Sequence, residues 1–170
     1  TELQYMAARA GISMTGSCYR IASFKLFANN DFYEADEQTI EEVHIISQLL
    51  EKYIAENYSG PVYFYKKNYL TNLAIFPVEE GSNLWRVLIE QACHWIQEEY
   101  SVETNWGISK ACTDLLFMWK AAEEAATAME HCQDMDHIVE YTASLEETGE
   151  YYFPDIVEEK LVSGIHSGDY

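Results

Sequence analysis

The chain has 170 residues, 48% of them hydrophobic, which is enough for one domain with its own core or one domain with an appendage. It carries 10 Lys and Arg residues against 29 Asp and Glu, a formal net charge of −19. Such a surface repels phosphate backbones, so we expect no direct binding of nucleic acid. No run of about 18 apolar residues is present, so we expect no membrane segment.

In the first half of the chain, hydrophobic periodicity predicts four elements. They are a short helix at residues 3–10, a strand at 18–28, a helix at 36–57 and a hairpin at 61–77. Both alternating sets of side chains in the strand include apolar residues, which is typical of a strand covered on both faces. Lys66 and Lys67 stand at the hairpin turn.

The second half begins with a predicted helix at 83–100 and a strand at 102–106. Gly107 is expected to turn the chain, and Thr113 to cap a helix that ends near residue 129. The inward face of that helix is expected to consist of Leu116, Trp119, Ala122, Ala126 and Met129. Residues 137–141 fit a last edge strand, and Pro154 suits the first turn of a final helix.

These elements predict an α/β sandwich with a mixed sheet of four or five strands flanked by helices, plus a C-terminal helix. We divide the chain into an α/β domain at residues 1–142 and a linker with a connecting helix at 143–170. The connecting helix leads toward a module beyond this chain. Thr1 is not a natural start, which favours a piece of a longer protein.

Four cysteines are present, and none forms a CxxC pair: Cys18, Cys93, Cys112 and Cys132. Their spacing is typical of buried or half-buried residues in a reducing compartment, not of a disulfide framework. The N-terminus also lacks the basic and then apolar pattern of an export signal. Together these features predict a cytoplasmic protein.

Two short patterns, in this order and spacing, carry a family resemblance. The first is Gly107-Ile108-Ser109 followed by the alanines at 122, 125 and 126. The second is the segment 151–169, with Tyr151-Tyr152-Phe153-Pro154, Glu158-Glu159, Leu161, Ile165 and Gly168-Asp169. Nearly the whole chain resembles the degenerate GGDEF-like middle domain of YesN/AraC-type bacterial regulators, which is related to the GGDEF-like domains of PucR and CdaR-type regulators. The inserted Phe153 departs from the usual wording of the second pattern.

The resemblance implies a GGDEF/nucleotidyl-cyclase-like fold and a place between an input module and an AraC-type DNA-binding module. The input is implied to be a receiver domain or a membrane sensor. A homodimer in the full-length protein is implied as well. Leu161 and Ile165 are then the residues expected to relay a signal along the final helix.

An active diguanylate cyclase needs carboxylates to hold two Mg²⁺ ions on its nucleotide. The resemblance places them on the first strand and in the hairpin turn. Here no Asp or Glu occurs between Glu2 and Asp31, nor between Pro61 and Val78. We therefore predict that the chain is not an enzyme, with no catalytic residues, no cofactor-binding residues and no cofactor.

The hairpin supplies candidates for an interface. They are Tyr63, Tyr65, Lys66, Lys67 and Tyr69, since exposed tyrosines are common where proteins meet. The alternatives are cross-strand pairing of the tyrosines within the sheet and a solubilising role for the two lysines.

A second cluster offers weak candidates for metal ligands: His131, Asp134, Asp136 and His137. Such clusters usually do not converge on one ion, so we predict no metal site. The late run of nine acidic residues from Asp134 to Glu159 is interpreted as a solvated face.

The sequence thus predicts a non-catalytic signal-relay domain of an AraC-family transcription regulator or two-component response regulator, acting through inter-domain contacts or dimerisation. The first alternative is a domain that senses a small molecule in the same class of regulator. The second alternative is an active nucleotidyl cyclase.

Overall fold

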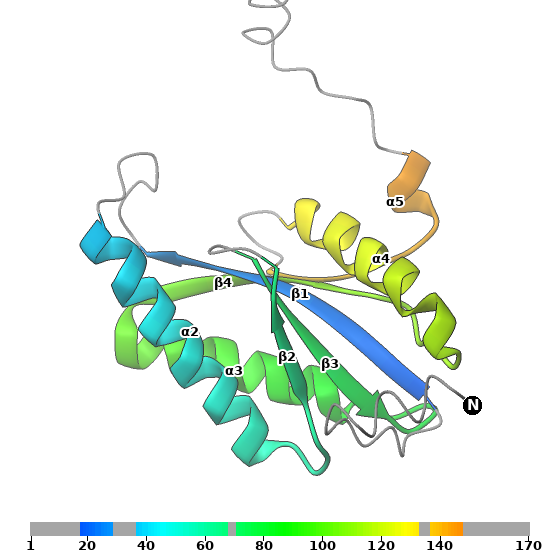
Figure 1. The fold of residues 1–170 in the computed structure, drawn as a ribbon, viewed down its shortest axis with the longest axis horizontal. Helices are drawn as coiled ribbons and strands as arrows, with labels where there is room; N and C mark the ends of the chain where they lie inside the picture. The colour runs from blue at the N-terminus through cyan, green and yellow to red at the C-terminus, as the bar shows by residue number, and fades with distance from the viewer. Residues whose placement is uncertain (1–17, 29–36, 68–70, 133–136, 148–170) are drawn as a thin grey trace, which may run out of the picture.

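The computed structural model describes residues 18–28, 37–67, 71–132 and 137–147. Five strands form one mixed sheet in the order β2-β3-β1-β4-β5. β1 is antiparallel to both β3 and β4, while β5 is parallel to β4 (Figure 1). The strands are β1 Cys18–Ala28, β2 Tyr63–Lys66, β3 Asn72–Val78, β4 Val102–Ile108 and β5 Ile138–Glu140. The predicted mixed α/β sheet is therefore confirmed.

Helices cover both faces of this sheet (Figure 1). α2 (Glu37–Asn57) and α3 (Leu84–Tyr100) pack on one face, and α4 (Met118–Glu130) packs on the other. A short helix α5 (Ser144–Glu147) follows β5. The larger core lies under α2 and α3, where the Phe24 and Trp106 rings stack with their centroids 4.2 Å apart.

Alternation along β1 explains why both of its faces are apolar. Ala22, Phe24 and Leu26 belong to the core under α2 and α3, whereas Ile21 packs with Ala121 and Ala125 of α4. β1 is the central strand of the sheet, so each set of side chains meets a helix layer.

The packing of α4 differs from the prediction in two ways. Gly107 lies inside β4 instead of at a turn after it, and Trp119 does not face the sheet. A Cβ at Gly107 would lie 2.0 Å from the carbonyl oxygen of Ala125, so the backbone of α4 rests directly on the strand. Small side chains favour that approach, and three of the four buried residues of α4 are alanines, namely Ala121, Ala125 and Ala128, with Met129 as the fourth. Leu116 and Trp119 are consequently left 61% exposed.

The entry into α4 also differs from the prediction. Cys112 pairs with Tyr19 through two backbone hydrogen bonds of 2.8 and 2.7 Å, which keeps the chain extended at that point. A 3-10 turn, η2 (Leu115–Phe117), then precedes the helix. Asp114 Oδ1 accepts a hydrogen bond of 2.9 Å from the N–H of Leu116, so Asp114 rather than Thr113 satisfies the free amide at this turn.

Some expectations fall outside the described residues: the helices at 3–10 and after Pro154, the relay positions Leu161 and Ile165, and the hairpin residue Tyr69. The division of the chain at residue 142 stays a prediction. The four cysteines are free, with Cys18 buried and the others half-buried, as predicted. Among the helices of the described ranges, none has both the length and the apolar character to cross a membrane.

Candidate functional site

The hairpin β2–β3 presents different side chains to the two faces of the sheet. Tyr63 and Tyr65 pair with Ile75 and Leu73, whose side chains lie on the α4 side. Lys66 pairs with Asn72 and reaches His44 on α2, on the opposite side. Of the predicted interface residues, Tyr63, Tyr65, Lys66 and Lys67 thus share one edge of the sheet but not one surface.

On the α4 side lies a hollow of about 710 Å³, which we call the α4 groove. It runs between the hairpin and the exposed stripe of α4. The hairpin side is lined by Tyr65, Lys67 and Leu73, and the helix side by Trp119, Lys120, Ala122, Glu123, Glu124, Ala126, Thr127 and Glu130, with Tyr141 completing the lining. The volume lies in the range of ligand sites, and the lining holds aromatic rings together with charges of both signs.

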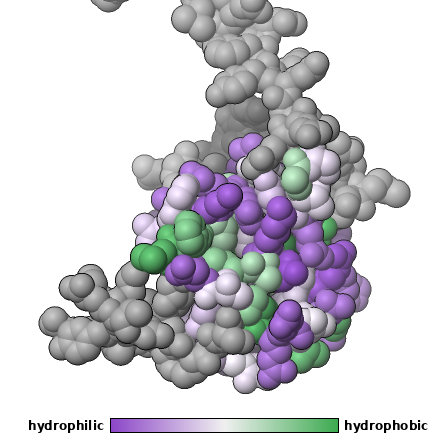
Figure 2. Space-filling view, turned by 90° about the vertical axis from the view of Figure 1, so that its right-hand side faces the viewer, coloured by the Kyte–Doolittle hydropathy of each residue, from purple (hydrophilic) through white to green (hydrophobic). Residues whose placement is uncertain are grey.

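Large apolar side chains stand exposed around this groove. Tyr65 is 63% exposed, Leu116 and Trp119 are each 61% exposed, and Phe117 is 55% exposed. Figure 2 faces the end of the molecule where α4 begins and shows apolar patches among hydrophilic residues. Leu116, Phe117 and Trp119 come together in η2 and the first turn of α4, and such an exposed apolar cluster marks an interaction surface more often than isolated exposed residues do.

On the α2 side, the hairpin forms a small polar cluster. Lys66 Nζ lies 2.7 Å from His44 Nδ1, and Gln48 Nε2 lies 3.1 Å from the other ring nitrogen. Burial raises the pKa of the nearby Glu51 carboxyl above its usual value, and the positive charge of Lys66 partly offsets this. Asn72 is buried at 3% exposure, and its Oδ1 has no hydrogen-bond partner within the described part of the chain.

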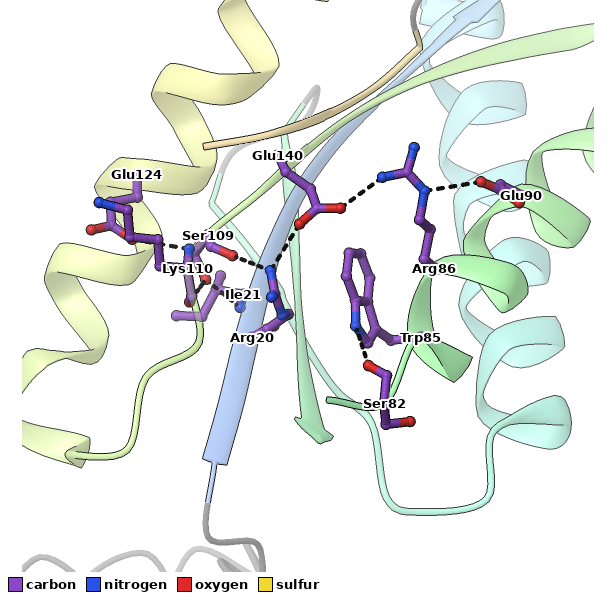
Figure 3. A network of polar contacts seen from close by, with 10 residues as sticks. All are labelled: Arg20, Ile21, Ser82, Trp85, Arg86, Glu90, Ser109, Lys110, Glu124 and Glu140. Atoms are coloured by element: carbon purple, nitrogen blue, oxygen red, sulfur yellow. Dashed lines mark hydrogen bonds and ion pairs between the residues drawn. The ribbon is translucent and has the colours of Figure 1, made fainter. Parts of the chain in front are cut away.

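A third polar network joins β5 to the rest of the fold (Figure 3). Glu140 accepts a hydrogen bond of 2.6 Å from Arg86 Nη1 and one of 3.2 Å from Arg20 Nη1. Arg20 also donates to the carbonyl of Ser109 at 3.0 Å and lies 4.7 Å from the centre of the Trp85 ring. One carboxylate thereby connects the edge strand β5 to the central strand β1 and to α3.

The weak metal candidates are only partly described. His131 Nδ1 lies 2.8 Å from the Thr127 carbonyl, and His137 Nδ1 lies 2.8 Å from Asn105 Oδ1. Asp134 and Asp136 fall outside the described residues. Within the described ranges, no three His, Cys, Asp or Glu side chains come together in a way that could hold a metal ion.

Cys93 shows how burial limits nucleophilic chemistry here. Burial raises the pKa of its thiol to about 11, while hydrogen bonding to Thr104 lowers it in part. Thr104 Oγ1 lies 3.2 Å from the sulfur. A thiol with this pKa is protonated at neutral pH, which disfavours its reaction as a nucleophile.

Three features of these sites were not predicted from the sequence: the exposure of Trp119, the buried Asn72 and the network around Glu140. One signal was present in the sequence. The alanines at 121, 125 and 128 recur at helical spacing opposite Trp119, and Gly107 sits in a strand pattern where close backbone approach is expected. The Glu140 network joins residues far apart in the sequence and had no local signal.

No family model matches this sequence, and no curated protein sequence matches it either. The fold, in contrast, has solved counterparts. The chain is similar to the GGDEF domain of DgcB from Caulobacter crescentus in complex with c-di-GMP, with a TM-score of 0.56 and 11% identity over 82% of this chain and 84% of that one. The active GGEEF domain of a diguanylate cyclase from Vibrio cholerae matches with a TM-score of 0.48 and 8% identity, over 81% of this chain and 88% of that one.

The likeness to DgcB establishes a GGDEF-like fold and confirms that part of the resemblance. It also overturns the prediction that the chain is not an enzyme. Over four fifths of its length, the chain has the fold of a domain solved with c-di-GMP. No Asp or Glu occurs in the first strand or the hairpin turn, but that lack does not by itself exclude catalysis by a chain with this fold.

Proposed function

We propose that this chain is a cytoplasmic signal-relay domain of a bacterial transcription regulator, either of the AraC family or in a two-component system. It acts through contacts with a neighbouring domain or with a second copy. The observation that carries this proposal is the exposed apolar surface beside the α4 groove, formed by Tyr65, Leu116, Phe117 and Trp119. Such a surface is expected to be covered by a partner in the working protein.

The order of the elements supports a route for the signal. β5 follows α4 along the chain, and the short α5 after it packs against α4. A module that follows this chain is therefore connected through a segment that contacts the α4 layer. A partner that binds α4 can influence that segment without any change in the larger core.

The test uses a full-length regulator that contains this chain and a transcriptional reporter of its response. Trp119→Glu places a charge on the exposed surface, and Ile45→Glu, at a residue 56% exposed on α2, is the matched control. We expect Trp119→Glu to abolish most of the signal response and Ile45→Glu to leave it intact, with equal protein levels. A normal response from the Trp119 variant would overturn the proposal.

The second candidate is a small-molecule sensor, favoured by the volume and aromatic lining of the α4 groove. The DgcB structure makes c-di-GMP the first ligand to test, together with GTP and Mg²⁺. A ligand at about 100 times its Kd adds roughly 2.7 kcal/mol to the folded state, which raises the melting midpoint by about 5–10 °C. Turnover of GTP in the same samples measures catalysis directly, and an unchanged midpoint with all three additions would count against nucleotide binding.

A further inference from the structure

We propose that the α4 groove is the contact surface between two copies of this chain, which pair through antiparallel α4 helices about a two-fold axis. This inference rests on the proposed function, because it names the partner of the relay surface. A two-fold interface uses the same patch on both copies, so the patch must complement itself in shape and in charge. The α4 groove meets both conditions.

The charge pattern of α4 selects one register. The polar stripe of α4 that lines the groove reads Lys120, Glu123, Thr127 and Glu130, of which Thr127 is half-buried and the other three are exposed. If the two-fold axis passed at the level of Glu123, each Glu123 carboxylate would face the Glu123 of the second copy and repel it. A shift of the centre by about half a turn puts Lys120 opposite the second copy's Glu130, and Glu123 opposite its Thr127. In that register both lysines meet carboxylates and no like charges oppose each other.

The shape of the groove fits the same register. Tyr65 pairs with Leu73, Leu73 pairs with Ser23, and the Ser23 Oγ lies 3.5 Å from the Met129 sulfur. Tyr65 therefore stands level with the last turn of α4, whereas Trp119 stands at the first turn.

An antiparallel pair consequently brings the Trp119 of each copy to the second copy's Tyr65 and Lys67. The indole then gains an aromatic neighbour and a cation, both favourable for an exposed tryptophan. Two half-buried alanines, Ala122 and Ala126, lie between these ends and leave room for close approach of the helices.

We expect the pairing to be weak because its contact area is small. α4 has 13 residues and is about 20 Å long, so the helix pair with its two hairpin contacts falls at the low end of specific interfaces. The net charge of −19 on each copy adds long-range repulsion. Physiological salt, about 0.15 M, screens this repulsion beyond about 8 Å while leaving close pairs effective.

The experiment measures the dimer dissociation constant of the chain by sedimentation equilibrium at about 0.15 M salt, with protein up to about 1 mM. The variants are Lys120→Glu, Glu130→Lys and the double exchange. We expect each single variant to weaken the dimer at least tenfold and the double variant to restore it to within about threefold. Both residues are exposed, so the melting temperature of each variant should stay at the wild-type value.

Net charge alone predicts a different pattern, because Glu130→Lys makes the chain less negative and would strengthen association. The matched control is the exposed pair Lys52 and Glu56 on α2, on the other face of the sheet. Lys52→Glu and Glu56→Lys make the same charge changes and should leave dissociation unchanged. Stronger association of Glu130→Lys, a double variant without recovery, or a chain that stays monomeric at 1 mM would each overturn the pairing. The reporter test of the relay surface does not depend on this result, so the two proposals fail separately.

Discussion

Gly107→Ala tests the account of how α4 is held on the sheet. The added Cβ would lie 2.0 Å from the Ala125 carbonyl oxygen, 2.2 Å from the Met129 nitrogen and 2.7 Å from the Met129 Cα. All three atoms belong to the helix backbone, so no side-chain rotation relieves the clash. α4 must lift off β4, or the strand must bend, and both lose contacts of Ala121, Ala125 and Ala128.

Overpacking typically costs about 1–3 kcal/mol, and a clash with helix backbone belongs at the upper end, about 3 kcal/mol. For a chain of this length, that lowers the melting midpoint by about 6–12 °C. The assay is urea unfolding followed by circular dichroism, with the free energy of unfolding extrapolated to water.

Two other glycines are matched controls in the same assay. A Cβ at Gly60 would meet Pro77 Cγ at an ordinary 3.6 Å, so Gly60→Ala should change stability by less than about 0.5 kcal/mol. Gly81 has open space but a φ of +78°, so Gly81→Ala should cost about 1 kcal/mol through backbone strain. If Gly107→Ala were no more destabilising than Gly60→Ala, the direct contact between α4 and β4 would be refuted.

Three further predictions concern single side chains. Glu140→Ala should cost about 1–2 kcal/mol and speed hydrogen exchange at the Tyr141 N–H, which bonds the Ile108 carbonyl at 2.8 Å; Glu90→Ala, which removes only one exposed bond to Arg86, should cost less than half as much. The pKa of Glu51 is raised in the fold, so its charged form is the disfavoured one and stability is lost as pH rises from about 4.5 through the raised pKa. Glu51→Gln should then match wild type near pH 4 and be more stable at pH 7, and equal stability at both values would refute the burial of Glu51. With a pKa of about 11, Cys93 should react with iodoacetamide at pH 8 more slowly than Cys112, as read by mass spectrometry, and faster labelling of Cys93 in the folded state would contradict its raised pKa.

Much of the fold follows from local patterns. Turn residues at 57–60 and 81–83 mark the end of one predicted helix and the start of the next, and α2 ends at Asn57 while α3 begins at Leu84. The two-sided apolar pattern of residues 18–28 predicted a strand covered on both faces, and β1 is covered in this way. These features depend on neighbours in the sequence, which is why the sequence could predict them.

The site was harder to predict because its features depend on distant residues. The orientation of α4 about its own axis depends on Gly107, which lies 11 residues before Met118. Gly107 has no side chain, so the backbone of α4 can contact β4 there. The helical spacing of Trp119 is compatible with a position facing the sheet and with one facing solvent. The contact between α4 and the strand decides between the two. The Arg20, Arg86 and Glu140 network joins three elements that meet only in the folded chain.

The most direct test of the central claim is the solvent exposure of Trp119 in the working protein. Hydroxyl-radical footprinting with mass spectrometry compares the dilute chain with the full-length regulator, and Trp106, which is fully buried, gives the baseline. We expect rapid oxidation of Trp119 in the dilute chain and at least severalfold protection in the full-length protein. Equal oxidation of Trp119 in both samples would show that nothing covers the α4 face and would contradict the relay surface proposed for it.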